Sequence, residues 1–127
     1  MIVTWIRARV QPTEDPEKVR QAIRNIFGEI ELETKQEVIS ARFEGVEALT
    51  GLRGVIARDR VRDTVRTVFT RWADDDRLSF GINRQAAYAG HFSLNLKGED
   101  AMGPIQVRVK GDIENVIGYL CEKSTHR

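Results

Sequence analysis

A chain of 127 residues with 31% charged and 41% hydrophobic residues can form one domain with its own core, and this composition excludes wholesale disorder. The formal net charge of +1 means that any attraction to nucleic acid must come from locally clustered basic residues. Cys121 is the only cysteine and no apolar run reaches membrane-spanning length, so we expect a cytoplasmic protein without disulfides or a membrane partner. A single domain is expected over 1–127, with a frayed tail at 124–127.

The first predicted element is a strand over residues 2–10. Its apolar residues alternate with Trp5, Arg7 and Arg9, which is the period-two pattern of a strand buried on one face. Trp5 and the two arginines are therefore expected to lie together on the exposed face.

A helix and a hairpin are predicted next. Asp15 before Pro16 is typical of a helix N-cap followed by proline at the first helical position, and apolar residues then recur at helical spacing until Gly28. The segments 29–33 and 37–43 favour two short strands joined by a turn.

The next predicted helix covers residues 46–56. Gly51 and Gly54 are each expected to lower its stability by about 1 kcal/mol relative to alanine. A break is expected near 57–59.

An arginine-rich helix is predicted from Arg58 to the end of its apolar stripe. Arg58, Arg62 and Arg66 recur at four-residue steps beside that stripe. The stripe consists of Val61, Val65, Val68, Phe69 and Trp72. The helix is thus expected to pack on a sheet, with basic charge along its margin.

The remaining elements alternate between strands and helices. They are strands over 78–82, 92–96 and 105–109, a short helical turn over 84–90 capped by Asn83, and a final helix that follows the cap residue Asp112.

The clean alternation in these strands predicts an α+β fold of two layers, with a mostly antiparallel sheet and helices on one face. The opposite face would be polar and mildly basic. It is expected to collect Trp5, Arg7, Arg9, Ser79, Asn83, His91, Ser93, Asn95, Lys97, Gln106, Arg108 and Lys110.

A basic sheet face with an exposed aromatic residue suits single-stranded RNA, because bases stack on rings while basic side chains bind phosphates. Trp5 with Arg7, Arg9, Arg108 and Lys110 fits this description. An ordinary solvated face, or a homodimer interface anchored by Trp5, explains the same pattern.

The arginine-rich helix offers a second set of phosphate contacts through Arg58, Arg62 and Arg66. Asp59 and Asp63 lie within ion-pairing reach on the same predicted helix, so a salt-bridged, solvated surface is the alternative.

Arg84 follows the Asn83 cap, where exposed amides and a guanidinium would suit an anion. The alternative is a plain connection between strands.

Catalysis finds little support in the sequence. His91 and His126 are the only histidines, and no set of histidine, carboxylate and nucleophile can be assembled around them. We therefore expect no catalytic residue, no metal and no cofactor. Cys121 lies on the apolar stripe of the last helix, where a buried, inert thiol is expected.

Four segments resemble an archaeal family of small uncharacterised proteins. They are PTEDPEKVRQAI at 12–23, RDRVRDTVR at 58–66, NRQAAYAGHFSL at 83–94 and GPIQV at 103–107. The resemblance implies an α+β fold similar to the large-subunit ribosomal protein called L five. It also implies kinship with predicted RNA-binding proteins, including a predicted exosome subunit, but no reaction whose residues transfer to this chain.

We therefore expect a non-enzymatic, RNA-binding or RNA-associated domain. The residues expected to contact RNA are Trp5, Arg7, Arg9, Arg58, Arg62, Arg66, Arg84, Arg108 and Lys110. The alternatives are a homodimeric protein-interaction module without nucleic-acid binding, and an enzyme for a phosphorylated small molecule held near 83–85.

Overall fold

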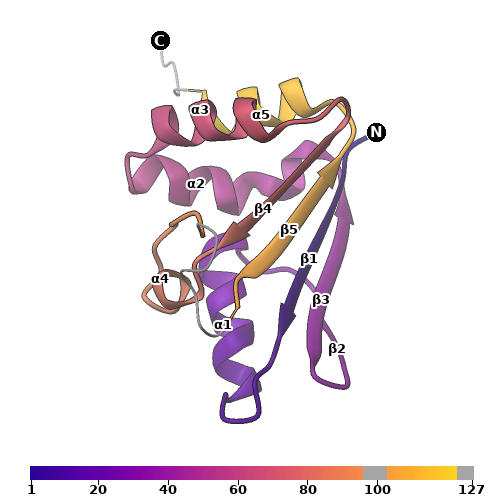
Figure 1. Cartoon of the computed structure of the whole chain (residues 1–127), viewed down its shortest axis with the longest axis vertical. Coiled ribbons are helices and arrows are strands. Elements are labelled where there is room, and N and C mark those ends of the chain that lie inside the picture. The colour runs from indigo at the N-terminus through magenta and orange to yellow at the C-terminus, as the bar shows by residue number, and fades with distance from the viewer. Residues whose placement is uncertain (96–102, 123–127) are drawn as a thin grey trace.

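The computed structural model describes residues 1–95 and 103–122, which fold into a sheet packed against helices (Figure 1). In chain order the elements are β1 (Val3–Arg9), α1 (Pro16–Phe27), β2 (Glu33–Lys35), β3 (Val38–Glu44), the 3-10 helix η1 (Val46–Leu49), α2 (Thr50–Arg58), α3 (Arg62–Trp72), β4 (Arg77–Ile82), α4 (Arg84–Tyr88), β5 (Ile105–Lys110) and α5 (Ile113–Cys121).

The strands form one antiparallel sheet in the order β2-β3-β1-β5-β4, with β1 at its centre. The helices lie on one side of this sheet, with α2, α3 and α5 gathered at one end and α1 and α4 toward the other (Figure 1). The predicted two-layer α+β architecture with a mostly antiparallel sheet is confirmed.

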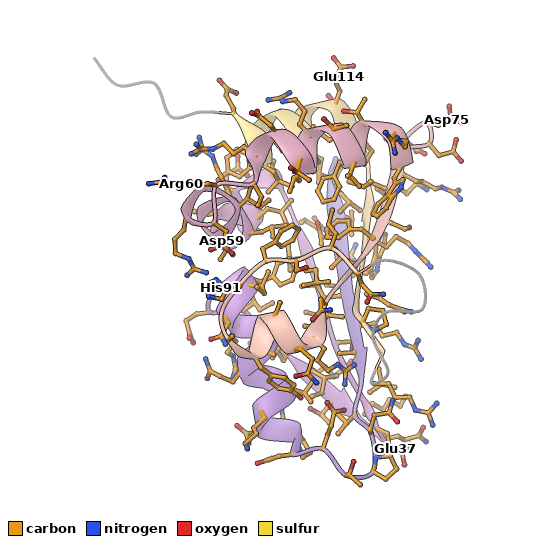
Figure 2. The ribbon with its side chains drawn as sticks, turned by 60° about the vertical axis from the view of Figure 1, so that its left-hand side comes forward. Glu37, Asp59, Arg60, Asp75, His91 and Glu114 are labelled. Carbon is orange, nitrogen blue, oxygen red and sulfur yellow. The ribbon has the colours of Figure 1, made fainter. Side chains whose placement is uncertain are left out.

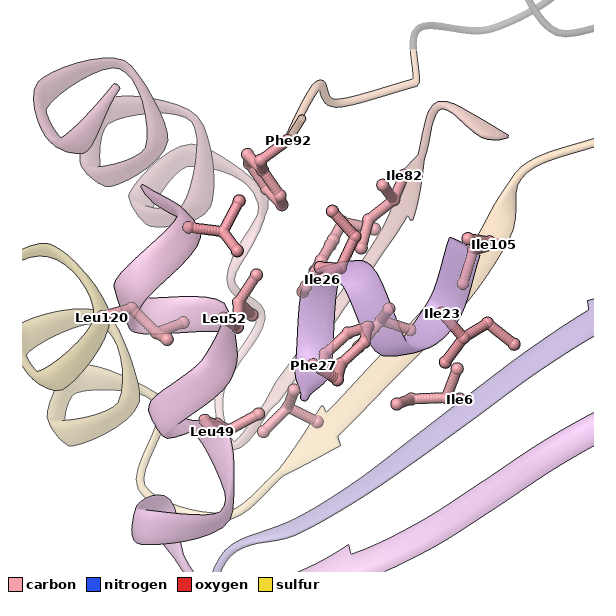
Figure 3. Packing of buried hydrophobic residues seen from close by; sticks show 14 of the residues in the cluster. Ile6, Ile23, Ile26, Phe27, Leu49, Leu52, Ile82, Phe92, Ile105 and Leu120 are labelled. Atoms are coloured by element: carbon pink, nitrogen blue, oxygen red, sulfur yellow. The ribbon is translucent and has the colours of Figure 1, made fainter. Parts of the chain in front are cut away.

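A single hydrophobic core lies between the two layers. Alternate strand residues point into it, as Ile6 and Val107 do, at 1% and 2% exposure. Ile26 and Phe27 of α1 and Leu52 of α2 pack into the same cluster (Figure 3). Burial of this apolar surface is the main stabilising contribution to a domain of this size.

The cap residues act as their sequence positions predict. Asp15, Asn83 and Asp112 each accept a hydrogen bond from an N–H in the first turn of the helix that follows. The donors are Glu17 at 3.0 Å, Ala86 at 2.9 Å and Asn115 at 3.1 Å. These bonds satisfy backbone donors that a helix leaves unpaired, so the helix starts are encoded locally.

The arginine-rich helix is shorter than the sequence suggests. α3 begins at Arg62, whereas Arg58 is the last residue of α2, so the three arginines do not share one helix. Between them Arg60 adopts a left-handed φ of 58°, which ends the preceding helix. The Asp59 carboxylate holds this break in place by accepting a 2.8 Å hydrogen bond from the Phe92 N–H.

The exposure of Trp72 and the predicted strand at 92–96 also differ from the sequence prediction. Trp72 closes the predicted apolar stripe and is the last residue of α3, but it is 36% exposed. The described part of the predicted strand 92–96 makes only an isolated bridge, between Leu94 and Ile82. Leu96 and Lys97 lie outside the described residues, as do 98–102, 124–127 and His126.

Gly51 lies where α2 approaches the end of α1. A Cβ at this position would lie 2.3 Å from the Phe27 carbonyl oxygen, a distance at which backbone must move. Gly54, one turn later in the same helix, has nothing within 4 Å of the corresponding position. The two glycines therefore have different roles, and only Gly51 is required for packing.

Gly51→Ala should lower the free energy of unfolding by about 2 kcal/mol or more, because α1 and α2 would have to separate. Gly54→Ala should raise it by about 1 kcal/mol, since alanine favours helix and meets no neighbour. Urea unfolding followed by circular dichroism measures both changes. Shifts of the same sign in the two variants would contradict the close-approach explanation.

Candidate nucleic-acid interface

The open face of the sheet places a guanidinium on each side of a tryptophan. Trp5 of β1 pairs with Arg42 of β3 and with Arg108 of β5. Directly paired residues of antiparallel strands point to the same face, with strands about 5 Å apart. Arg42, Trp5 and Arg108 therefore form one row across three strands.

Neighbouring rows extend this basic character. Arg7 pairs with Gln106 of β5, and Lys110 of β5 pairs with Val3 of β1 and with Arg77 of β4. The central part of the sheet thus presents polar and cationic side chains in a regular two-residue repeat.

A groove of about 1660 Å³ runs across these rows. Its lining includes Trp5 and Arg108 of the central strands, and also Glu31, Trp72 and Asn95. The groove therefore combines aromatic and cationic groups of the central strands with the carboxylates of Glu31 and Glu33 toward the β2 edge.

Several cations of this face have no ionic partner in the part of the chain that the structure describes. Within residues 1–95 and 103–122, Arg7, Arg108 and Lys110 form no ion pair. Arg42 pairs with Glu44 at 3.1 Å and Arg77 lies 3.8 Å from Asp76, with all four side chains about half-exposed or more. Surface pairs of this kind contribute little and exchange readily for other anions.

The structure brings together four of the residues that are predicted from the sequence to contact RNA. Trp5, Arg7, Arg108 and Lys110 all line the groove. Arg9 lies on the same strand but outside the groove, 3.7 Å from Glu37.

Arg42, Arg77 and Trp72 are among the lining residues that sequence reasoning missed. Arg42 follows the alternation of its predicted strand, so extending the face analysis to 37–43 would have found it. The spacing of Trp72 matches the buried stripe of its helix, which predicts a core position instead.

The helix arginines lie elsewhere. None of Arg58, Arg62 and Arg66 lines the groove. Asn83 and His91, which were expected on the sheet face, do not line it either; Asn83 caps α4, and His91 contacts Asp59 at 3.4 Å.

Arg84 is the largest departure from the expected site. Its side chain is 1% exposed and pairs with Glu14, itself 5% exposed, at 2.6 Å. It also donates a 2.8 Å hydrogen bond to the Arg9 carbonyl oxygen. The expectation that Arg84 contacts RNA is therefore wrong, because its guanidinium is buried in an internal ion pair.

The carboxylate of Glu14 is fully engaged in this cluster. It accepts hydrogen bonds from the Gln11 N–H at 2.8 Å and the Tyr88 hydroxyl at 2.7 Å as well as from Arg84. Burial acts to raise the pKa of Glu14, but the hydrogen bonds from Gln11, Tyr88 and Arg84, together with the Arg84 charge, hold it below its ordinary value. The cluster ties β1 and the following loop to α4.

We also searched the described part of the chain for a metal site, a reactive thiol and a membrane-spanning helix. No group of three or more His, Cys, Asp or Glu residues there is arranged to hold a metal ion. Cys121 is buried, and burial raises the pKa of its thiol. No helix within the described ranges combines the length and apolar character needed to cross a membrane.

The one-sided helical layer and the basic, aromatic groove define a small α+β domain with an open sheet face as its candidate binding surface. A family model described as RNA binding matches residues 5–111. The chain belongs to this family, whose curated relatives are archaeal UPF0201 proteins.

Two relatives illustrate the similarity. The UPF0201 protein of Pyrobaculum aerophilum is 34% identical over 122 residues, which covers 91% of this chain and 85% of the relative. The UPF0201 protein of Methanothermobacter thermautotrophicus is 32% identical over 116 residues, with coverages of 91% and 87%.

Solved structures show the same fold. A UPF0201 crystal structure has a TM-score of 0.81 and 25% identity, covering 96% of this chain and 94% of that one. The UPF0201 protein from Methanococcus jannaschii has a TM-score of 0.78 and 26% identity, covering 94% and 98%.

Glu14→Gln should lower the free energy of unfolding by about 3 kcal/mol near neutral pH, because it leaves the buried Arg84 charge uncompensated. The folded-state pKa of Glu14 is depressed, so its stabilising contribution is present above its ordinary pKa of 4.5 and is lost as pH falls through the lower folded value. The variant should therefore lose less stability on acidification than the wild type.

Urea unfolding at about pH 7 and about pH 3 measures this difference. Glu37→Gln is the matched control, because Glu37 forms an exposed pair with Arg9. Equal effects of the two substitutions would refute the role of the buried cluster.

Proposed function

We propose that this domain is a non-enzymatic RNA-binding protein that holds single-stranded RNA on its open sheet face. The observation that carries the proposal is the row of Arg42, Trp5 and Arg108 across three adjacent strands. An aromatic ring between two guanidinium groups offers a stacking platform and phosphate donors at the same place.

Each part of the row has a role in this proposal. A base stacks on the Trp5 indole, while Arg42 and Arg108 bind the phosphates that flank it. Arg7 and Lys110, which have no ion pair among the described residues, extend the phosphate path along the neighbouring rows. Arg42 would exchange its exposed partner Glu44 for a phosphate.

Single-stranded RNA fits this surface better than a duplex. Stacking on Trp5 requires an unpaired base, because the faces of bases in a helix are covered by their neighbours. Trp72, at the margin of the same groove, offers a second ring for another unpaired base.

The family match supports the assignment independently. The model described as RNA binding covers residues 5–111, a range that includes Trp5, Arg42 and Arg108.

A homodimer formed through the same face is the competing occupant of the groove. In that case Trp5 would be covered by a second copy, and the measured mass would rise with protein concentration. Sedimentation with and without RNA distinguishes the two occupants, since RNA bound in the groove would compete with self-association.

Trp5→Ala should weaken binding of a mixed-sequence single-stranded RNA by about 1–3 kcal/mol, the contribution of one stacked base. Arg108→Glu should weaken binding across sequences and reduce the slope of log K against log salt by about 1 or more. Fluorescence anisotropy at low and physiological salt measures both effects.

Arg66→Glu is the matched control for charge, because Arg66 is exposed on α3 and lies outside the groove. Equal losses in Arg66→Glu and Arg108→Glu would point to a nonspecific charge effect. Loss only in Arg66→Glu would move the binding surface to α3 and defeat the proposal for the sheet face.

A further inference from the structure

A second group of basic side chains lies at the corner between α2 and α3. Arg58 ends α2, Arg60 lies in the connection, and His91 approaches from the segment that follows α4. None of these residues lines the sheet-face groove. Figure 2 shows Arg60 projecting outward from the corner, with Asp59 and His91 beneath it.

Asp59 organises this corner. Its side chain is 12% exposed, and one carboxylate oxygen accepts a 2.8 Å hydrogen bond from the Phe92 N–H. The other oxygen contacts both Arg58 Nε at 3.2 Å and His91 Nδ1 at 3.4 Å. A guanidinium and an imidazole are therefore held against the same oxygen atom.

This arrangement leaves specific donors facing outward. When both ring nitrogens of His91 carry protons, Nδ1 donates to Asp59 and Nε2 on the opposite edge of the ring can donate to a ligand. Arg58 donates from Nη2 to the Gly90 carbonyl oxygen, so Nε and Nη2 are engaged and its other terminal nitrogen remains for a ligand. The side chains of Arg58 and His91 are 55% and 65% exposed, so a ligand can reach them.

Arg60 adds a second guanidinium at a position where glycine would be favoured. Its φ of 58° lies in the left-handed region, which disfavours side chains with a Cβ. Its side chain is exposed, so packing does not explain why arginine occupies the position. Arg60 therefore presents a guanidinium to solvent from the connection between α2 and α3, two positions after Arg58.

We infer that Arg58, Arg60 and His91 form a binding site for a phosphate group. Two guanidinium groups provide directional donors to phosphate oxygens, and the imidazole adds one through Nε2 when both of its nitrogens are protonated. Of the nearby acids, Asp59 is occupied by its three donors and Asp63 lies in the first turn of α3. The phosphate belongs either to an RNA end or to a phosphorylated small molecule.

The test is an NMR titration of ¹⁵N-labelled protein with inorganic phosphate, compared with chloride at equal ionic strength. Phosphate should shift amide signals of 58–62 and 91–92, and Arg60→Gly should weaken that binding roughly tenfold, the effect of losing one charge-assisted contact. The same variant should melt at a higher temperature than the wild type, because glycine relieves the left-handed strain.

Gln36→Gly is the matched control. Gln36 also has a left-handed φ, of 57°, and lies in the hairpin turn between β2 and β3, so this variant should gain thermal stability and keep its phosphate affinity. His91→Gln should weaken phosphate binding while preserving the fold, since the His91 side chain is mostly exposed. Trp5→Ala should leave phosphate binding unchanged, which separates this site from the groove.

Unchanged affinity in Arg60→Gly, or no phosphate-specific shifts at the corner in the wild type, would overturn the inference. The same titration with uridine 5′-monophosphate and with oligonucleotides carrying or lacking a 5′-phosphate distinguishes the source. Preference for the 5′-phosphorylated oligonucleotide assigns the site to an RNA end, and equal or better binding of the monophosphate assigns it to a small molecule.

Discussion

The pairing register of β1 is the constraint on which the rest of the molecule depends. β1 is the central strand and pairs with both β3 and β5, so its alternation decides what faces the core and what faces outward. A slip of one residue would bury Trp5 and Arg7 and expose Ile6, which is now 1% exposed. The hydrophobic core and the candidate binding surface are therefore specified by the same strand pairing.

The Glu14–Arg84 pair extends this constraint from the sheet to the helical side. Arg84 donates to the carbonyl oxygen of Arg9, the last residue of β1, while Glu14 binds the Tyr88 hydroxyl in α4. A buried ion pair adds less stability than an apolar contact of similar size, because both charges lose water. Its directional hydrogen bonds specify one arrangement of the β1 end, the following loop and α4.

The sequence predicted what is encoded by local spacing. The alternation of β1 and β5 and the caps Asp15, Asn83 and Asp112 are such features, and all five appear in the structure. Prediction from the sequence failed for side chains whose burial depends on a partner far away in the chain. Nothing near Arg84 in the chain indicates burial, because its carboxylate partner is Glu14, seventy positions earlier.

The position of the break between α2 and α3 also depends on a partner that is distant in the chain. Asp59 is held by the Phe92 N–H, a contact between residues 33 positions apart, so spacing around 58–72 alone suggested a longer helix. Trp72, the last residue of α3, matches the buried period but lines the groove. The candidate site was therefore predictable for β1 and β5, and not for residues whose environment depends on tertiary contacts.

The charge distribution limits how the groove can recognise a ligand. The chain has a net charge of only +1, and Glu31 and Glu33 line the groove together with its arginines. Long-range attraction to a polyanion is therefore weak, and at physiological salt it is screened beyond about 8 Å. In the proposed function, affinity for a single strand would therefore come mainly from short-range contacts within the groove, with stacking on Trp5 added to the phosphate contacts. Such a surface disfavours nonspecific binding to duplexes, whose bases are unavailable for stacking and whose phosphates would meet the carboxylates at the groove margin.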